Sequence, residues 1–450
     1  MIAPYIPAHK SFSITPSLGI GYLASTLLKE KYEVEIIDCL ARDINNEKLK
    51  DIIQKSQPDL IGFSVLSMFY NQTRGAIEKI RSISSAPIIV GGPHISALPE
   101  ESLEELKPDF VVVGEGENTL LELANALKAR TNDFESINGI YYKSNGSIHK
   151  TPARELIDDL DCIPFPAWHL MDPRSYPPIA HGTFYKRFPI APIITTRGCP
   201  MQCSFCAAHH IWTRKLRRRS PKNVVDEIEF LHDTFGVKEF HFEDDCLTTV
   251  KKHILAICQE IVARNLDVVW ACPNGVRIDS LDEEILRNMK KAGCYMMALG
   301  IESGSQELLD RAKKKLDLKL VPAVVETIKK VGIQTVGFFL LGLPGETKET
   351  IKQTVDLALD LPLDIAKFHN LIPLPQTEIF EQLSTEVKQQ IDWEKYNSFD
   401  QAVCETEGLS KDEITRLQKW ANKRFYLRPK TFLKTILMIK PKQYYWIAKR

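Results

Sequence analysis

The sequence has no net charge and no long hydrophobic run. Lys plus Arg and Asp plus Glu both number 58, so the whole chain exerts no long-range attraction on nucleic acid or an anionic membrane. Its first residues lack a basic stretch followed by an apolar core, and no apolar run approaches the roughly 18 residues of a membrane span. We therefore expect a cytoplasmic protein without a signal peptide, a transmembrane helix or a nucleic-acid partner.

Cysteine is also sparse outside one loop. Ten cysteines spread over 450 residues do not form the dense disulfide framework of a small secreted domain. In a reducing compartment, clustered cysteines indicate a metal site or catalysis, whereas isolated ones usually fill apolar cores. For Cys246, Cys272 and Cys294, which follow or begin predicted strands, we expect buried packing rather than a reactive thiol.

Residues 1–135 alternate between helical and extended patterns. Short continuous apolar runs between amphipathic helices are typical of a parallel sheet covered on both faces. The pattern predicts a doubly wound, Rossmann-like α/β domain. The strand that should precede the first helix is not evident, because only MIAPYIP stands before that helix; either the chain start is clipped or that edge of the sheet is short. An incomplete sheet of this kind could be a scaffold that binds nothing.

A second alternation covers residues 191–385. Its six consecutive strand and helix pairs favour a partial (β/α)6 barrel of the TIM type over an open sheet. Between the two units, residues 136–190 combine a hairpin at Asn145-Gly146 with a proline-rich stretch, which is the expected linker. Residues 386–450 are predicted to form a helical, basic C-terminal region.

Three cysteines share the loop TTRGCPMQCSFC, after the first strand of the second unit. Cys199, Cys203 and Cys206 have the spacing C-x3-C-x2-C, and His209 follows three residues later. Zinc accepts three cysteines and a histidine, so a structural zinc site is one interpretation. The other is a [4Fe-4S] cluster, in which three thiolates leave one iron open to a substrate or cofactor. The loop lies where barrels place their active sites, which favours the cluster.

With Phe205 before its last cysteine, the loop resembles the signature of the radical S-adenosylmethionine (SAM) enzymes. In that family the open iron binds the amino and carboxylate groups of SAM, and an electron from the cluster cleaves SAM to methionine and a 5′-deoxyadenosyl radical. The resemblance implies an external electron donor such as flavodoxin or ferredoxin. It also implies SAM contacts from other strand ends: Glu243 or Asp244 in FHFEDD, Glu302 and Ser303 in GIES, and Gly342 and Gly345 in GFFLLGLPGE. The alternative for each is a helix cap or a turn.

The first unit resembles the cobalamin-binding domain that one branch of these enzymes carries. The matching segments include PSLGIGYLAS, SVL, GGPH and GEGE. The resemblance implies cobalamin contacts at Ser64, Leu66, Gly91, Gly92, His94, Gly114 and Glu115. No histidine has the D-x-H-x-x-G pattern that often ligates cobalt, and for His94 we expect a hydrogen bond within its own turn rather than a cobalt bond.

These resemblances imply a cobalamin-dependent radical SAM enzyme that methylates an unactivated carbon of a small-molecule or lipid-like substrate. A cyclase or oxidoreductase without methyl transfer is the alternative within the branch. A non-catalytic metal-binding or sensing protein is the alternative from another class. The related transfer-RNA methylthiotransferases take three more cysteines from the first domain, where this chain has only Cys39 and Cys162. No catalytic residue is identified.

Two basic segments remain. For the run TRKLRRR, Thr213 to Arg219, we expect solvation or contacts with the loop rather than nucleic acid. After Glu413 the chain has eleven basic and no acidic residues, interleaved with aromatic and aliphatic ones that include Tyr444, Tyr445 and Trp446. This mixture suits weak peripheral contact with an anionic membrane. A helix packed on the barrel with its lysines in solvent is the alternative, which we favour.

Overall fold

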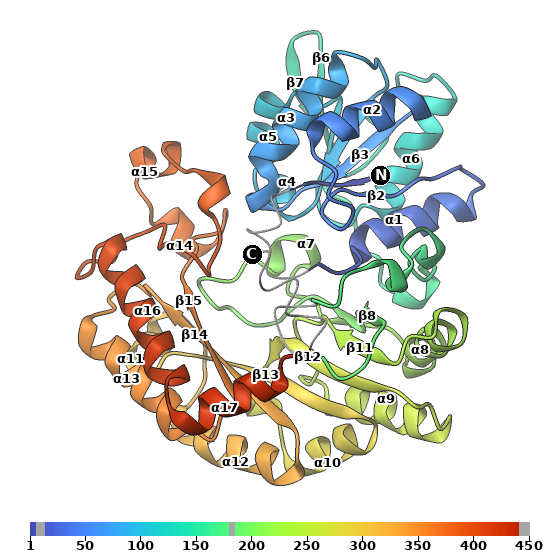
Figure 1. Ribbon diagram of the computed structural model, residues 1–450. Coiled ribbons are helices and arrows are strands. Elements are labelled where there is room, and N and C mark those ends of the chain that lie inside the picture. Colours follow the sequence, from blue (N-terminus) through green and yellow to red (C-terminus); the bar gives the residue numbers. More distant parts are fainter. Residues whose placement is uncertain (6–13, 180–184, 441–450) are drawn as a thin grey trace.

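The computed structural model describes residues 1–5, 14–179 and 185–440 (Figure 1). It contains two parallel sheets with helices on their faces, one above the other in Figure 1, and a helical C-terminal region beside the second. This architecture confirms the doubly wound domain followed by a partial barrel. Within these ranges, no helix is long and apolar enough to cross a membrane.

The first sheet has seven strands in the order β2-β1-β3-β4-β5-β6-β7. The strands from β1 to β5 are parallel where they pair, and β6 and β7 are added antiparallel. The strands are β1 (Ile2–Ala3), β2 (Ile37–Asp38), β3 (Ile61–Ser64), β4 (Ile88–Gly91), β5 (Phe110–Val112), β6 (Ile140–Ser144) and β7 (Ser147–Lys150). The helices are α1 (Leu18–Lys29), α2 (Asn46–Ser56), α3 (Tyr70–Arg81), α4 (Pro93–Ala97), α5 (Pro99–Leu106) and α6 (Glu117–Lys128).

Two features of this sheet differ from the sequence prediction. The strand before the first helix is present, because Ile2 and Ala3 form β1 between β2 and β3. With only two residues it is too short to show a periodic pattern, yet Ile2 is 1% exposed. The hairpin that we assigned to the linker is β6 and β7. It extends the first sheet, because Tyr141 and Tyr142 are buried on its two faces.

The second sheet has six parallel strands in the order β15-β14-β13-β12-β11-β8, as expected for a partial barrel. The strands are β8 (Ile190–Ile193), β11 (Glu239–Phe242), β12 (Val269–Val276), β13 (Cys294–Glu302), β14 (Gln334–Leu341) and β15 (Ile365–Asn370). The helices between them are α8 (Pro221–Phe235), α9 (Lys251–Ala263), α10 (Glu283–Lys291), α11 (Gln306–Arg311), α12 (Val321–Val331) and α13 (Lys348–Asp360). Their apolar faces form one large core against the strands.

Short elements surround the cysteine loop. The strands β9 (Thr196–Arg197) and β10 (Arg217–Arg218) pair antiparallel, with α7 (His209–Trp212) between them. The C-terminal region contains α14 (Glu378–Glu381), α15 (Thr385–Gln389), α16 (Lys411–Tyr426) and α17 (Pro429–Met438). Packing of α16 on the barrel buries Ile414, Ala421 and Phe425. The aromatic residues Tyr444, Tyr445 and Trp446 lie outside the described residues.

The two units share apolar packing. Leu18 and Tyr22 of α1 belong to the same buried cluster as the barrel core, and Trp168 of the connecting segment lies there as well. The indole Nε1 of Trp168 donates a hydrogen bond of 2.9 Å to Glu227 on α8. The position of the first unit on the barrel is therefore fixed by side chains from both.

Candidate active site

The cysteine loop follows β8 and β9 at the C-terminal edge of the barrel sheet. Gly198 begins it with φ +95°, and a Cβ there would lie 2.2 Å from the carbonyl oxygen of Lys215, so only glycine fits. The Cys199 amide donates a 3.2 Å hydrogen bond to the Thr213 carbonyl. The loop is thus held by backbone contacts, and Cys199, Cys203 and Cys206 are all partly exposed.

The three thiols have different environments. Burial raises the pKa of Cys203 and raises that of Cys206 to about 11, so both are protonated near neutral pH until a metal displaces the proton. Cys199 has a fourth thiol beside it, because the Sγ of Cys246 lies 3.2 Å from its own Sγ. The hydrogen bond from Cys246 lowers the pKa of Cys199 to about 6. Cys246 is buried, as predicted, but in contact with this loop.

The fourth ligand that a zinc site requires is engaged elsewhere. His209 hydrogen-bonds the backbone of Cys206, and its ring packs against His210 with centroids 4.0 Å apart. Three thiols on one loop, partly open to solvent, suit three corners of an iron–sulfur cluster.

Phe205 links the cysteine loop to other strand ends. Its ring packs against the buried cluster of Leu308, Ala312, Leu343, Leu371, Ile379 and Cys404. The neighbouring Ser204 amide donates a hydrogen bond of 3.0 Å to the Ala312 carbonyl. The aromatic residue of the signature therefore acts as a packing anchor between the loop and the turn after β14.

Asp244 accepts hydrogen bonds from the residues that lead into the cysteine loop. Its Oδ1 accepts hydrogen bonds from the Thr195 amide at 3.0 Å and from the hydroxyls of Thr195 at 2.8 Å and Thr196 at 2.6 Å. Burial raises its pKa to about 6, and Oδ2 has no partner among the described residues. Its neighbour Glu243 is partly exposed, and its amide donates to the Ile193 carbonyl at 2.8 Å. Asp244 therefore holds the loop with one oxygen, and its other oxygen is buried without a hydrogen-bond partner among the described residues.

Glu302 ends β13 in a strained conformation. Its φ is +67°, and the register with β14 shifts at this point, which is typical of functional positions. Its Oε1 forms an ion pair of 2.7 Å with Lys314, and both side chains are nearly buried. Ser303 serves the backbone instead, because its hydroxyl accepts from the Ser305 amide at 3.1 Å and lies 3.3 Å from the Thr354 hydroxyl.

Gly342 and Gly345 form the turn after β14. The carboxyl group of Glu346, fully buried, accepts hydrogen bonds from the amides of Gly342 and Leu343. Burial raises the pKa of Glu346 to about 8. The sequence alone assigned no role to Glu346. The signal that could have identified it is its place four residues after Gly342 in an otherwise apolar segment.

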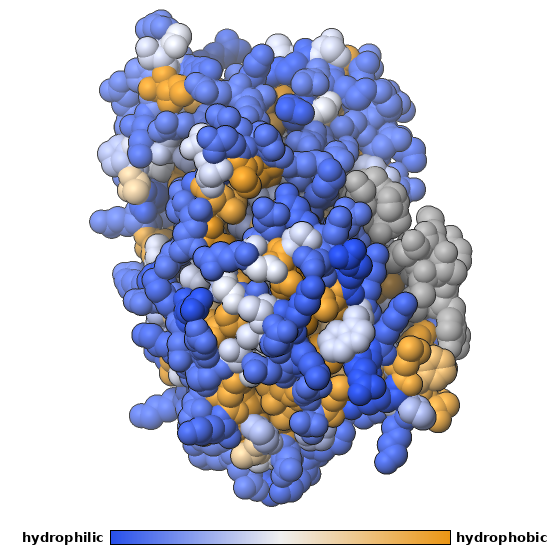
Figure 2. Space-filling view, turned by 90° about the vertical axis from the view of Figure 1, so that its left-hand side faces the viewer, coloured by the Kyte–Doolittle hydropathy of each residue, from blue (hydrophilic) through white to orange (hydrophobic). Residues whose placement is uncertain are grey.

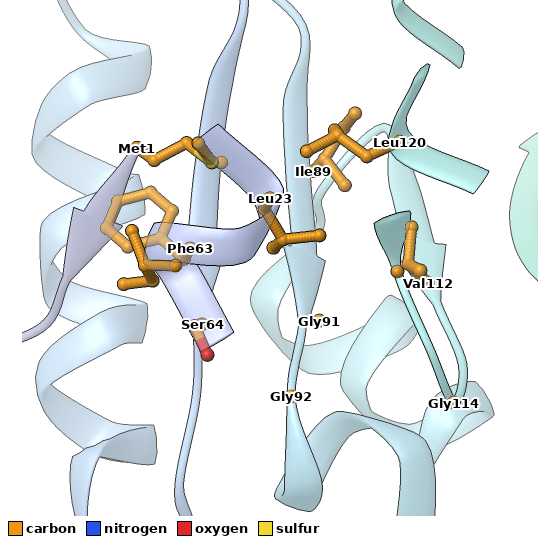
Figure 3. Close-up of a pocket in the computed structure, with 13 residues that line it drawn as sticks. Met1, Leu23, Phe63, Ser64, Ile89, Gly91, Gly92, Val112, Gly114 and Leu120 are labelled. Atoms are coloured by element: carbon orange, nitrogen blue, oxygen red, sulfur yellow. The ribbon is translucent and has the colours of Figure 1, made fainter. Parts of the chain in front are cut away.

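A pocket opens at the C-terminal edge of the first sheet (Figure 3). In Figure 3, Leu23 of α1 and Leu120 of α6 lie near the strands that carry Phe63 and Ile89. Ser64 supplies the single polar side chain among the lining residues, which are Met1, Ile20, Leu23, Gly62, Phe63, Ser64, Ile89, Gly91, Gly92, Val112, Gly114, Gly116 and Leu120. The lining of the pocket is therefore almost entirely apolar.

Four of the seven expected cobalamin contacts line this pocket: Ser64, Gly91, Gly92 and Gly114. A Cβ on Gly92 would lie 2.8 Å from the Val65 amide nitrogen, and its φ is +103°, so the backbone approaches the pocket without a side chain.

The other three, Leu66, His94 and Glu115, are not among the lining residues. Leu66 is 44% exposed at the surface. His94 packs between Tyr70 and Trp393, with centroids 4.4 and 4.6 Å away, and Nδ1 lies 2.9 Å from the Ser67 hydroxyl. Burial lowers its pKa to about 4. His94 is thus a neutral core histidine.

Glu115 belongs to a buried ion-pair network between the two units. Its Oε1 lies 2.9 Å from Arg197 and its Oε2 lies 2.8 Å from Arg217, while Arg197 also pairs with Glu117 at 2.6 Å. All four side chains are at most 7% exposed. Arg197 precedes Cys199 by two residues, and Glu115 follows the pocket residue Gly114. The network therefore joins the cysteine loop to the pocket.

The basic run has a structural role that the sequence analysis did not assign. We expected solvation or loop contacts, but Arg217 and Arg219 are buried on Glu115 and Glu227 respectively. Arg214, Lys215 and Arg218 remain exposed. The carboxylates that partner the buried arginines lie about 100 and 8 positions away, so only the fold reveals the first of these pairs.

The chain matches two family models in the same order as its two units. Residues 6–124 match the B12 binding domain, and residues 193–358 match the radical SAM superfamily. The fold and the site thus define an enzyme that pairs a corrinoid-binding domain with a radical SAM barrel.

Similar proteins extend this match over the whole chain. It is 33% identical to "Uncharacterized methyltransferase PH0819" of Pyrococcus horikoshii, over 94% of this chain and 90% of the relative. It is 30% identical to an anaerobic magnesium-protoporphyrin IX monomethyl ester cyclase of Rubrivivax gelatinosus, over 93% and 75%. The solved structure of the radical SAM methyltransferase TsrM from Kitasatospora setae, with cobalamin and [4Fe-4S] cluster bound, shares the fold with a TM-score of 0.72. That pair is 20% identical and covers 98% of this chain and 91% of the other.

The chain belongs to the cobalamin-dependent branch of the radical SAM superfamily. Its cofactors are a [4Fe-4S] cluster, SAM and cobalamin.

Proposed function

We propose that the protein transfers a methyl group to an unactivated carbon of a small molecule. The observation that carries this proposal is the buried network of Glu115, Arg197 and Arg217, which ties the pocket of the first unit to the cysteine loop of the second. A methyl carrier and a radical generator must act on one substrate, so their sites need a fixed relation. The four buried charged side chains of Glu115, Glu117, Arg197 and Arg217 fix the position of one unit on the other.

The residues divide the work of binding between them. Cys199, Cys203 and Cys206 would hold the cluster. The free oxygen of Asp244, with Glu243, would receive the amino group of SAM, while Glu302 would accept its ribose hydroxyls. Gly342 and Gly345 would lie along the adenine. When bound, the cluster supplies the electron that cleaves SAM, and cobalamin supplies the methyl group.

Lys314 orients the Glu302 carboxylate. Burial alone would lower the pKa of Lys314, but the charge of Glu302 raises it, so the ammonium group stays protonated. The hydrogen-bonded ion pair fixes one carboxylate oxygen, which gives hydroxyl groups a defined acceptor.

For cobalamin, we propose that one flat part of the cofactor enters the pocket against Ser64, Gly91, Gly92 and Gly114. The whole cofactor is larger than this pocket, so the rest would extend toward the cysteine loop. Leu66 could still contact cobalamin through its exposed side chain, and Glu115 could contact it through backbone atoms. His94 would have to leave its packed position to reach cobalt, and we propose that cobalt receives no histidine from this domain.

The test uses anaerobically reconstituted protein with SAM that carries a deuterated methyl group, reduced cobalamin and a reductant. We expect deuterated methylcobalamin, detected by mass spectrometry, without any knowledge of the final substrate. Unlabelled or absent methylcobalamin would refute methyl transfer. The similarity to a cyclase makes ring formation or oxidation the second candidate, and cleavage of SAM without methylcobalamin is the result that favours it.

We propose a reductant such as flavodoxin or ferredoxin, a cytoplasmic location and weak membrane contact through the C-terminal region. The domain limits at residues 135, 190 and 385 also remain proposals. The place of the β6 and β7 hairpin in the first sheet favours a limit near residue 150 instead of 135.

A further inference from the structure

Helix α17 lies across the end of the barrel opposite the cysteine loop. Arg428 donates a 2.9 Å hydrogen bond to the Leu359 carbonyl at the end of α13, and Lys434 pairs with Asp364, just before β15. Lys440, beyond the helix, contacts the Lys186 carbonyl ahead of β8. Since β15 and β8 are the two edges of the sheet, α17 spans the opening of the partial barrel at the N-terminal ends of its strands.

The polarity of α17 is reversed. Surface helices usually turn their apolar stripe inward and their charged side outward. Here Lys434 and Thr435 are partly buried on the side of the barrel, and Met438 packs against a buried barrel cluster, whereas the other large apolar side chains of the helix face out. The exposed fractions are 49% for Phe432, 61% for Leu433, 42% for Ile436 and 85% for Leu437, with 69% for Leu427 just before the helix.

These side chains form one patch. Positions 432, 433, 436 and 437 share a face of the helix because residues three and four apart are neighbours on it. They and Leu427 are five of the eleven large hydrophobic residues that are exposed in the described chain. Figure 2 shows hydrophobic side chains that protrude at its lower right edge, where the turn from Figure 1 brings α17.

The exposed charged side chains at the end of α16 and on α17 are basic. The chain has no acidic residue after Glu413, and Arg424, Lys430 and Lys423 are exposed on α16 and α17. An apolar helix face bordered by Lys and Arg is the pattern that binds the interface of anionic lipids. A second copy of the chain is a poor partner, because a symmetric contact would place these cations against each other.

We propose that the patch of Leu427, Phe432, Leu433, Ile436 and Leu437 on and before α17 binds the surface of an anionic lipid bilayer. The apolar side chains enter the headgroup region, and the flanking cations contact lipid phosphates. The cysteine loop and the pocket of the first unit then lie on the side of the barrel away from the bilayer.

The test is co-sedimentation of the full chain with vesicles of phosphatidylcholine alone or with phosphatidylglycerol added. We expect binding to the anionic vesicles that weakens as salt increases. Replacing two exposed leucines, L433E with L437E, should reduce the partition coefficient by about a hundredfold, because two buried apolar side chains are lost and two negative charges face the anionic surface. The control, L320E with V387E, also places two glutamates at exposed apolar positions, 46% and 42% exposed, on other elements and should bind as the unchanged chain does.

The remaining outcomes each refute the proposal. Absence of sedimentation with anionic vesicles refutes it directly. Loss of binding on deletion of residues 441–450, with L433E/L437E unaffected, assigns the contact to that segment and not to α17. If L433E/L437E lowers the molecular mass measured by light scattering but does not change sedimentation with vesicles, the patch binds a second copy of the chain and not lipid. Cleavage of SAM by the same samples is measured separately, so a failure of the proposed reaction leaves the vesicle result intact.

Discussion

Glu115 offers the sharpest test of the joint between the two units. The perturbation is Glu115→Gln, which keeps the shape of the side chain and removes its charge. Oε1 and Oε2 of Glu115 contact Arg197 and Arg217 at 2.9 and 2.8 Å, and the side chain is 3% exposed. Arg197 retains Glu117, whereas the one hydrogen-bond partner that remains for Arg217 in the described part of the chain is the Ile157 carbonyl at 2.7 Å. The substitution therefore leaves buried arginine charge without its partner.

The expected cost follows from burial. Removing one partner of a buried pair costs roughly 3 to 5 kcal/mol. The matched control is Asp267→Asn, which makes the same chemical change in the exposed pair with Arg187, where Asp267 is 68% exposed. A surface pair contributes about 0 to 1 kcal/mol. In urea unfolding followed by tryptophan fluorescence, we expect a midpoint lower by roughly 1 M for E115Q and little change for the control.

The pH dependence adds a second readout. Burial alone would raise the pKa of Glu115, but hydrogen bonds and charge from Arg217 and Arg197 outweigh burial and lower it below 4.5. A lowered carboxyl pKa means stability that is fully present above pH 4.5 and lost as the pH falls through the folded value. The gap between the unchanged chain and E115Q should therefore be widest near neutral pH and close in acid. Equal midpoints for E115Q and the control at pH 7 would refute the reasoning.

Two further predictions concern the two cofactor sites. Cys246→Ala removes the thiol that hydrogen-bonds Cys199, so the pKa of Cys199 should rise from about 6 toward 9.0. The pKa is measured as the pH midpoint of alkylation by iodoacetamide in cluster-free protein. An unchanged midpoint would contradict the contact between the two thiols. Gly92→Ala forces a Cβ to within 2.8 Å of backbone at φ +103° and should abolish cobalamin loading. The control is Gly19→Ala on α1, outside the pocket lining, where no atom lies within 4 Å of the added Cβ and cobalamin should load normally. Equal cobalamin absorbance in the two variants argues against the pocket.

Much of the architecture could be predicted from the sequence because both units repeat strand and helix at regular spacing. Each predicted strand of the barrel is present, and the cysteine loop lies at the strand end where the pattern placed it. The exceptions have local causes. β1 has two residues and shows no period, and the β6–β7 hairpin reads the same whether it is a linker or the edge of a sheet.

The site was harder to predict where partners are distant in sequence. Glu115 and Arg217 lie 102 positions apart, and a glutamate in a glycine-rich loop gives no sign that it will meet arginines from the other unit. His94 shows the same limit, because its neighbour Trp393 comes from the C-terminal region. A short motif identifies the type of ligand well, but it cannot show which of its side chains will be buried in the core instead of contacting the ligand.

The most direct test of the central claim is the fate of SAM. Anaerobically reconstituted protein, given SAM and a strong reductant, should release 5′-deoxyadenosine, and a Cys203→Ala variant should release none while its urea midpoint stays close to that of the cluster-free parent. Intact SAM in the first sample, with cluster absorption present, would contradict an open iron at Cys199, Cys203 and Cys206.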